Sequence, residues 1–527
     1  MRATLAPAPA PAPSFAPAPA AAPAGVRRPW VAKEGAGVGV AIGFITVAGL
    51  ALLAIQLSQP GYLFGVTEYD DAVYFGAAVR LVHGALPYHD YVFQQPPGIA
   101  LLLSPIGLLS RLIGTRDGLA VARVLTVLVG GANIALLGRL LRHRGLPAAL
   151  VGCAALAAFP ATIRSAHTVL LEPYLVLACL VGAIIAFEGD ELAEGRRLAW
   201  AGVVFGLAGA VKLWAIFPVL VIAALCLPDV RRRLVPFVGG VAAGFVVPCA
   251  PFFLVAPGRF VTETITDQLS RLVVSPVPVL ARLEVLTGMG GSGIPLTAAA
   301  TAGVVLVLAA FMAGSFVATR LGLSRLESFV LGTGSLVMLA FLVAGQFFGH
   351  YAAFFALFLA ALLGLAAARW RLTSPVGPMG TALAAVVLGG AIFASGASFL
   401  ERDYSSGVDP GLVIQRSVPA GACVVTDLTS ETITANRLVA NSPRCPLLLD
   451  GAGTDRVLGG NQDALPRDTS APAVGRAWLS YLERAQYVVL SSPRTQQIPW
   501  TPQIQAYSAA HFVRVKALGV YLYRRTS

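Results

Sequence analysis

Three carboxylates lie close together just after the first long apolar segment of the chain. They belong to the run 67–74, which contains Glu68, Asp70 and Asp71. Ionisable groups beside a bilayer are costly to keep near hydrocarbon, and they are usually functional where they persist. This acidic run is therefore the first candidate site.

The composition is that of a polytopic membrane protein. The 527 residues are 56% hydrophobic and 12% charged, with a mean hydropathy of +0.75. A soluble protein is about 25% charged. The net charge of +12 is spread over short clusters between apolar runs of roughly 20 residues, which is the positive-inside pattern. No basic helix or aromatic–basic platform accompanies this charge, so we expect no nucleic-acid partner.

Three regions follow from the composition. Residues 1–33 are rich in Ala and Pro and predict a disordered cytoplasmic tail, not a signal peptide. Residues 34–400 hold the apolar runs and predict a transmembrane domain. Residues 401–527 have a soluble composition and predict a small extracytoplasmic α/β domain, long enough for a core of its own.

The basic clusters set the predicted topology. The first span is 36–57, and the basic residues before it place the N-terminus in the cytoplasm and the acidic run outside. The apolar run 98–114 contains Pro105 and is ambiguous. If it spans, every later basic cluster falls on the outer side, so we expect a juxtamembrane or re-entrant helix and a next span at 119–141. Further spans are expected near 147–163, 169–187, 198–211, 213–228, 235–256, 293–318, 327–345, 351–368 and 378–399, about eleven in all.

The C-terminal region contains the pattern of a small sheet. Residues 422–427 and 486–491 read as buried strands, and 513–524 as a strand pair around Gly519. Cys423 and Cys445 lie here, and an extracytoplasmic location allows a disulfide between them. The other four cysteines lie in apolar runs and are expected to be buried.

With this topology the unusual polar residues gather on the outer face. A site of carboxylates facing cations could deprotonate one group and neutralise an anion on another. Structural alternatives exist for several members: the acidic pair could cap a helix, Glu172 could favour a helix N-terminus, and Lys212 could snorkel to the interface. The candidates are Asp70, Asp71, Asp90, Glu172, Lys212, Arg271, His350 and Tyr351, with Glu68, Arg164, His167 and Gln346 as weaker ones.

The motifs around these residues resemble the GT-C glycosyltransferase superfamily, in particular protein O-mannosyltransferases, aminoarabinose transferases and bacterial family-39-like enzymes. The first-loop motifs are 69–74, 81–84, 87–91 and 96–98, and the later ones are Glu172-Pro173, 209–212 and His350-Tyr351. The resemblance covers about residues 36–400. Those families usually carry Asp-Glu at the acidic pair, whereas this chain has Asp71 at the second position, which puts a role for the second acid in doubt.

The resemblance implies an inverting sugar transfer from a polyprenyl-phosphate donor to an acceptor hydroxyl on the outer face. Asp70 would be the general base, with Asp71 beside it. Lys212, helped by His350 or Arg271, would stabilise the leaving polyprenyl phosphate. Asp90, Glu172 and Tyr351 would help to bind substrate. No nucleotide is required, and a divalent cation is left open.

The acceptor would be a cell-envelope glycan, lipid or protein. The Ala-, Gly- and Arg-rich composition suggests a high-GC bacterium, for which a mannose or arabinose donor is expected. Two other classes of function compete. A transporter or lipid flippase would place its site near the bilayer midplane, at an internal repeat, and no repeat is seen. A membrane scaffold would leave the acidic pair and Pro96-Pro97 without a role.

Overall fold

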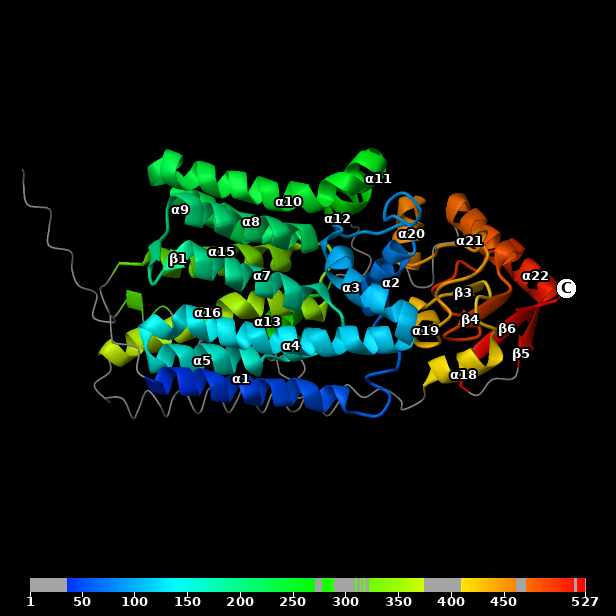
Figure 1. Cartoon of the computed structure of the whole chain (residues 1–527), viewed down its shortest axis with the longest axis horizontal. Coiled ribbons are helices and arrows are strands. Elements are labelled where there is room, and N and C mark those ends of the chain that lie inside the picture. Colours follow the sequence, from blue (N-terminus) through cyan, green and yellow to red (C-terminus); the bar gives the residue numbers. More distant parts are fainter. Residues whose placement is uncertain are drawn as a thin grey trace, which may run out of the picture.

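A bundle of apolar helices carries a small α/β domain at one end (Figure 1). The computed structural model describes residues 36–270, 277–288, 322–373, 409–460, 471–515 and 519–526, and single positions between 309 and 317. The predicted tail 1–33 and the predicted span 378–399 lie outside the described residues. The predicted span 293–318 lies almost wholly outside them.

Apolar helices of membrane-spanning length are present in the described part of the chain. Five helical segments there are long and apolar enough to cross a membrane, or six when one bent pair counts as a single span. The total of about eleven therefore stays a prediction, while the helical, multi-pass character is confirmed. The bundle helices are α1 (Ala36–Leu57), α4 (Thr115–Leu141), α5 (Leu146–Ala157), α6 (Pro160–Ala166), α7 (Leu171–Ala186), α8 (Gly195–Val211), α9 (Ile216–Cys226), α10 (Val235–Val255), α15 (Arg325–Val343) and α16 (Ala352–Thr373).

Small residues allow α8 and α10 to pack closely. A Cβ built on Gly202 would lie 2.2 Å from the Phe237 carbonyl oxygen, and one on Gly240 would lie 2.0 Å from that of Ala199. Such distances leave no room for a side chain. Without a hydrophobic force between helices in lipid, close backbone approach of this kind is what holds neighbouring spans together.

One predicted span is broken. The sequence predicts a single helix near 147–163, but the chain bends by 60° between α5 and α6. Pro160 begins α6 and has no N–H to continue the ladder of the preceding helix, and Phe159 before it is extended. The bend redirects the chain towards the segment 167–170, which reaches the acidic run.

The loop after α1 contains two helices, α2 (Tyr69–Val82) and α3 (Gly98–Ile113). α3 has 16 residues and contains Pro105, so it is shorter than the roughly 20 residues that a span needs. α7 is equally short, so length alone does not test whether 98–114 crosses, and the non-crossing helix stays a prediction. The loop after α10 is helical as well, with α11 (Pro257–Val261), the π-helix η5 (Thr262–Thr266), α12 (Asp267–Leu269) and α13 (Val279–Leu286).

The C-terminal domain is built on a four-stranded sheet in the order β3-β4-β6-β5, in which β3 and β4 are parallel and the other pairs antiparallel. The predicted strands are confirmed at both places and in the final pair. Cys423 and Cys445 form a disulfide. The elements are α18 (Pro410–Ser417), β3 (Val424–Thr426), α19 (Thr429–Thr434), α20 (Gly451–Val457), α21 (Pro472–Arg484), β4 (Tyr487–Leu490), α22 (Pro502–His511), β5 (Phe512–Val515) and β6 (Tyr521–Arg525).

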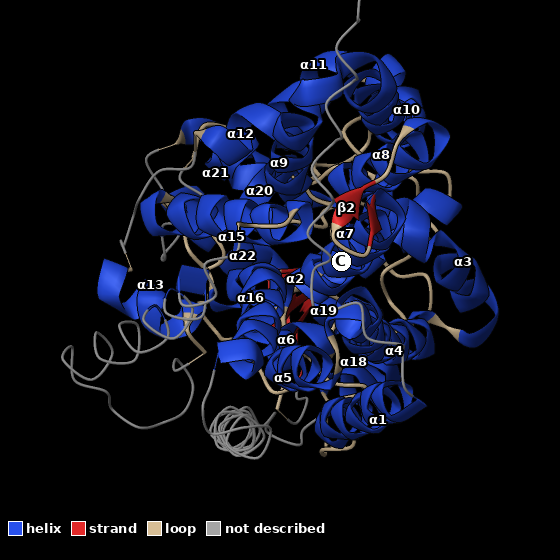
Figure 2. Cartoon of the chain, turned by 90° about the vertical axis from the view of Figure 1, so that its left-hand side faces the viewer, coloured by secondary structure: helices blue, strands red, loops and turns tan. Residues whose placement is uncertain are grey.

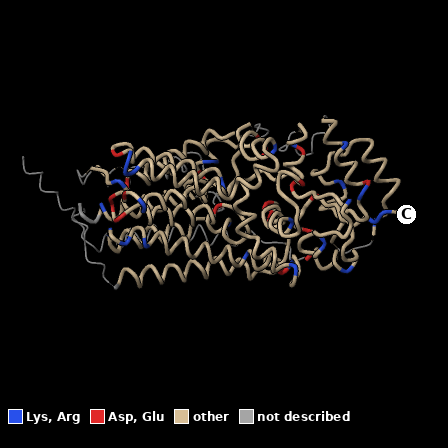
Figure 3. The backbone as a smooth tube through the Cα atoms, turned by 45° about the horizontal axis from the view of Figure 1, so that its top comes forward, with Lys and Arg blue, Asp and Glu red and all other residues tan. Residues whose placement is uncertain are grey.

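Charged residues gather towards the two ends of the bundle, and its middle is nearly free of them (Figure 3). One end carries α2, α3 and the C-terminal domain. The opposite end, seen face-on in Figure 2, carries a short hairpin of β1 (Phe187–Glu188) and β2 (Glu191–Leu192), the 3-10 helix η1 (Arg142–Arg144) and the π-helix η4 (Val230–Leu234).

Candidate active site

The acidic run forms the start of α2. Glu68 is the N-cap, and its side chain accepts a hydrogen bond from the backbone N–H of Tyr69. Asp70 and Asp71 lie in the first turn, where the helix dipole favours negative charge. The rest of α2 is rich in buried small and aromatic residues, which pack it against α3 and α19. The helix therefore holds its acidic end in a fixed place.

Asp71 is fully buried and belongs to an ion pair. Its Oδ2 lies 2.5 Å from Nη2 of Arg123 and accepts a hydrogen bond of 2.7 Å from the Thr168 hydroxyl. Both side chains of the pair are 0% exposed. A carboxylate paired with a buried arginine is less able to take a proton from a substrate than a free one, and the catalytic role expected for Asp71 stays a prediction.

Arg123 ties the loop before α2 to the bundle. Its Nη1 donates to the backbone carbonyls of Tyr62, Leu63 and Gly65 at 2.8–3.0 Å. The guanidinium thus fixes the chain that leads from α1 to the acidic run, and Asp71 balances its charge. Arg123 was not among the residues predicted from the sequence, because it lies within an apolar helix far along the chain.

Asp70 is less buried than Asp71 and has different hydrogen-bond partners. Its side chain is partly exposed, and the hydrogen bond that it accepts from the Tyr74 hydroxyl is long, at 3.4 Å. Desolvation is the largest cause that raises the pKa of Asp70, to about 7, and the negative charges of Glu68 and Asp450 act in the same direction. A general base works best with a pKa near the operating pH, so Asp70 has the properties of one.

Four more predicted residues meet at the same end of the bundle. Nζ of Lys212, at the end of α8, lies 2.5 Å from Oε1 of Glu172 in the first turn of α7. Nε2 of His350 lies 3.9 Å from the same oxygen. Lys212 also lies over the rings of Trp214, at 3.6 Å, and Tyr351, at 4.7 Å.

These contacts bear on the structural alternatives. The side chain of Lys212 is 8% exposed and that of Glu172 is 1% exposed, so Lys212 does not snorkel to the interface. The pair also acts on Asp70: the charge of Lys212 lowers the pKa of Asp70 and that of Glu172 raises it. The carboxylate of α2 and the cation at the end of α8 therefore share one electrostatic environment. In such an arrangement the carboxylate can take up a proton, and the cation can stabilise a developing negative charge.

The C-terminal domain closes the other side of Asp70. The Tyr69 hydroxyl donates to Oδ1 of Asp450 at 2.9 Å, and the Ser430 hydroxyl donates to the Glu68 carbonyl at 3.0 Å. Asp450 also caps α20 through the Gly453 N–H. Asp450 was not predicted from the sequence. Its position before the helix that begins at Gly451 indicates a helix cap but not a place beside Asp70.

A second set of contacts fixes this domain against the bundle. Arg116, at the start of α4, forms an ion pair with Asp409, and its backbone N–H donates to the side chain of Asn436 at 2.8 Å. The Thr115 hydroxyl donates to the Ile433 carbonyl at 2.7 Å. The domain therefore sits firmly beside α2 and α4.

Other predicted residues do not join this arrangement. Asp90 lies in an exposed turn, where its side chain accepts a hydrogen bond from the Leu86 N–H at 2.7 Å and contacts the His89 ring at 2.8 Å. Arg271 lies outside the described residues. Arg164 approaches Glu68 at 3.7 Å, and His167 contacts the Tyr62 hydroxyl.

Within the described part of the chain, no group of three or more His, Cys, Asp or Glu side chains is arranged to hold a metal ion. The divalent cation that the sequence left open therefore stays a prediction. The substrate-binding role of Arg271 stays one too.

The chain has clear likeness to known proteins. The model of glycosyltransferase family 87 matches residues 93–345. The fold is similar to that of ArnT from Cupriavidus metallidurans bound to undecaprenyl phosphate, with a TM-score of 0.60 at 15% identity over 92% of this chain and 98% of that chain. The apo state of ArnT gives 0.59 at 16% identity, over 93% and 98%.

An Archaeoglobus fulgidus oligosaccharyltransferase, in complex with Zn and sulfate, gives a TM-score of 0.52 at 13% identity, over 85% of this chain and 68% of that chain. At these identities the likeness concerns the fold. No curated protein sequence matches the chain.

Proposed function

We propose that this chain is a membrane glycosyltransferase of the GT-C superfamily, and that it transfers a sugar from a polyprenyl-phosphate donor to an acceptor hydroxyl, with inversion at the anomeric carbon. The match of residues 93–345 to the glycosyltransferase family 87 model and the similarity of the fold to that of ArnT support this proposal. The observation that carries this proposal is the contrast within the acidic pair. Asp71 is neutralised by Arg123, whereas Asp70 keeps a partly exposed carboxylate whose pKa is raised to about 7.

The proposed step is a single displacement. Asp70 takes the proton of the acceptor hydroxyl as its oxygen forms a bond to the anomeric carbon. The bond between that carbon and the phosphate oxygen breaks, and the polyprenyl phosphate leaves with the electron pair. Removal of a proton by a positioned base contributes about 10²–10⁴-fold to the rate.

The leaving phosphate needs positive charge on the side opposite the acceptor. Lys212 is proposed for this role because it is a buried cation whose charge acts on Asp70. Glu172 and Tyr351 contact its ammonium, and His350 lies 3.9 Å from the same Glu172 carboxylate. Arg271 is proposed as a second cation. An arrangement fixed before the reaction stabilises developing charge at little cost in reorganisation.

The donor class is supported by the ArnT structure, which contains undecaprenyl phosphate. A lipid-linked donor also suits the site, because α2 and α3 lie at the end of an apolar helical bundle (Figure 1). We propose mannose or an arabinose-like pentose as the sugar, and an envelope glycan, lipid or protein as the acceptor.

The proposed site faces the extracytoplasmic side. The arginine-rich segments η1 and η4 lie at the opposite end of the bundle, which the positive-inside rule assigns to the cytoplasm. The disulfide between Cys423 and Cys445 supports the same orientation, because disulfides persist in oxidising compartments.

The test compares Asp70→Asn with Asp117→Asn in membranes supplied with radiolabelled polyprenyl-phosphate mannose or arabinose and envelope acceptors. Asp117 is a matched control because it is an exposed acid in the first turn of α4, at the same end of the bundle. We expect Asp70→Asn to lower the transfer rate by about 10²-fold or more and the control to keep it. Full activity of Asp70→Asn would remove Asp70 as the base. Translocation of intact donor without sugar transfer would favour a flippase.

A further inference from the structure

A cavity of about 220 Å³ lies in the C-terminal domain, remote from Asp70. It is enclosed by the end of α21, by β4 and the segment that follows it, by α22 and by β6. We call it the Trp500 cavity. Figure 1 shows α22 at the far end of this domain from the helical bundle, whereas Asp70 lies in α2 beside the bundle. No step of the proposed sugar transfer uses this cavity.

The floor of the Trp500 cavity is apolar. It is formed by side chains that are 1–9% exposed, namely Leu482, Val488, Leu490, Ile498 and Phe512. A sugar would leave several hydroxyls without hydrogen-bond partners against such side chains, which is costly. The floor therefore favours an alkyl chain.

The volume of the cavity limits the length of that chain. An apolar cavity of roughly 150 Å³ accommodates benzene, a ring of six carbon atoms. By proportion, a cavity of about 220 Å³ holds roughly eight or nine carbon atoms. It is therefore large enough for a medium-length chain and too small for the two long chains of a phospholipid.

The rim of the cavity supplies positive charge. Arg494 lines the cavity and is exposed, and it forms neither an ion pair nor a side-chain hydrogen bond with any residue that the structure describes. Among the described lining residues, it is the only charged side chain. The hydroxyl of Tyr523, which also lines the cavity, makes no hydrogen bond to the described part of the chain. Both groups can therefore donate to an anion.

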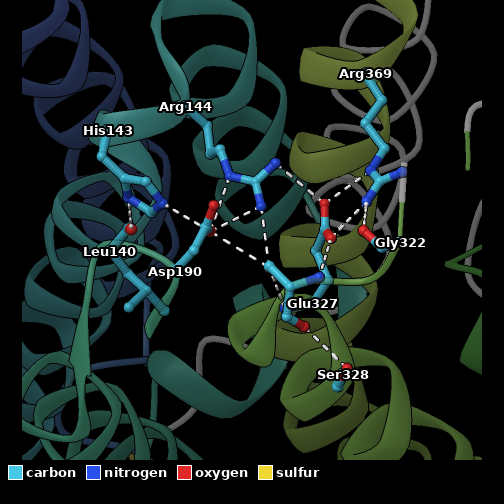
Figure 4. A network of polar contacts seen from close by, with 9 residues as sticks. Leu140, His143, Arg144, Asp190, Gly322, Glu327, Ser328 and Arg369 are labelled. Carbon is cyan, nitrogen blue, oxygen red and sulfur yellow. Dashed lines mark hydrogen bonds and ion pairs between the residues drawn. The ribbon is translucent and has the colours of Figure 1, made fainter. Parts of the chain in front are cut away.

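The buried charges at the opposite end of the molecule show the contrasting arrangement (Figure 4). Arg144 lies 2.7 Å from Asp190 and 3.0 Å from Glu327, and Arg369 lies 2.6 Å from Glu327. Each of these cations meets an acid of the chain itself. Arg494 meets none within the described residues, so its charge is left for a ligand.

The rim beside Arg494 is held in place before a ligand arrives. The indole N–H of Trp500 donates to the Thr495 carbonyl at 2.9 Å, and the Thr495 hydroxyl accepts from the Gln497 N–H at 3.2 Å. Thr495 is 2% exposed. From α22, Nε2 of Gln505 donates to the Trp500 carbonyl at 2.8 Å. A wall ordered in advance lowers the entropy cost of binding.

We propose that the Trp500 cavity binds a medium-chain alkyl carboxylate. The chain lies on the apolar floor, and the carboxylate meets Arg494, whose planar guanidinium is well matched to it. The Tyr523 hydroxyl donates to the same anion. Burial of the chain supplies the affinity, and Arg494 supplies the preference for an anion over a neutral alcohol of equal length. Because the cavity is remote from Asp70, this proposal does not depend on the reaction.

The test is photoaffinity labelling of the full chain in nanodiscs with a diazirine analogue of octanoate. Mass spectrometry of the labelled peptides reports the probe bound at the cavity separately from the probe dissolved in the bilayer. Octanoate and octanol serve as competitors, and a series from butanoate to dodecanoate measures the dependence on chain length.

Two pairs of variants are compared. Arg494→Gln removes the cation, and Arg476→Gln is its control, because Arg476 is an exposed arginine of α21 outside the cavity lining. Ala509→Phe fills the cavity, and Ala510→Phe is its control, because Ala510 is the next exposed residue of α22 and does not line the cavity. Thermal unfolding curves check that all four variants are folded.

We expect labelling of the lining residues, with octanoate competing at about fivefold lower concentration than octanol. Arg494→Gln should abolish this preference and Arg476→Gln should keep it. Each methylene between butanoate and octanoate should improve competition by about fourfold, and the gain should level off once the cavity is full. Ala509→Phe should abolish the labelling, whereas Ala510→Phe should not.

Three results would overturn the proposal. One is equal competition by octanoate and octanol in the wild type. Another is equal labelling of Ala509→Phe and Ala510→Phe. The third is competition by methyl mannoside at the concentration at which octanoate competes, which would identify a carbohydrate site instead.

Discussion

Lowering the pH should switch off the reaction near neutrality, well above the range in which an ordinary aspartate titrates. The base must be ionised to accept a proton, and the pKa of Asp70 is raised from 3.8 to about 7. Activity should therefore be present above this value and be lost as the pH falls through it. An aspartate with the usual pKa would keep full activity down to about pH 5.

The size of the effect follows from the ionised fraction. With a pKa of about 7, roughly 90% of Asp70 is ionised at pH 8 and roughly 10% at pH 6. We expect kcat/KM for sugar transfer to fall about tenfold between these values, because kcat/KM reports the ionisation of the free enzyme.

The assay measures initial rates of transfer in detergent or nanodiscs from pH 4.5 to 8.5, with Asp450→Asn to assign the midpoint. Asparagine keeps an oxygen that can accept from the Tyr69 hydroxyl and cap α20, but it removes the negative charge that raises the pKa of Asp70. The midpoint should therefore move to lower pH. A wild-type midpoint below pH 5, or a midpoint that Asp450→Asn leaves in place or raises, would refute the reasoning.

Two further predictions concern stability. Asp71→Asn leaves the buried Arg123 without its acid, so the free energy of unfolding should fall by about 3–5 kcal/mol and the Tm should fall with it. The control Asp117→Asn should leave the Tm unchanged. An unchanged Tm for Asp71→Asn would contradict the importance of the buried pair. Replacing Cys423 and Cys445 by serine removes a disulfide that closes a loop with a sequence separation of 22, and it should destabilise the C-terminal domain by about 3 kcal/mol. Limited proteolysis within that domain should become faster. Equal cleavage rates in the variant and the wild type would argue against a stabilising disulfide.

Much of the architecture could be predicted because it depends on neighbours in the sequence. The predicted span 36–57 coincides with α1, and the buried runs 422–427 and 486–491 contain β3 and β4. The family-level resemblance also selected Asp70, and it selected Glu172 and Lys212 separately. Their contact at 2.5 Å was not predictable from spacing, since the two residues are 40 positions apart.

The properties that separate the candidate base from its neighbour were decided only by the tertiary structure. Asp71 meets Arg123 across 52 positions, and Tyr69 meets Asp450 across 381. The sequence determined the first span, the strands and the acidic run, because hydrophobic periodicity and helix capping are local. Ionisation depends instead on burial and on every charge within a few ångströms, wherever it lies in the chain, so only the folded arrangement leaves Asp70 available and Asp71 paired.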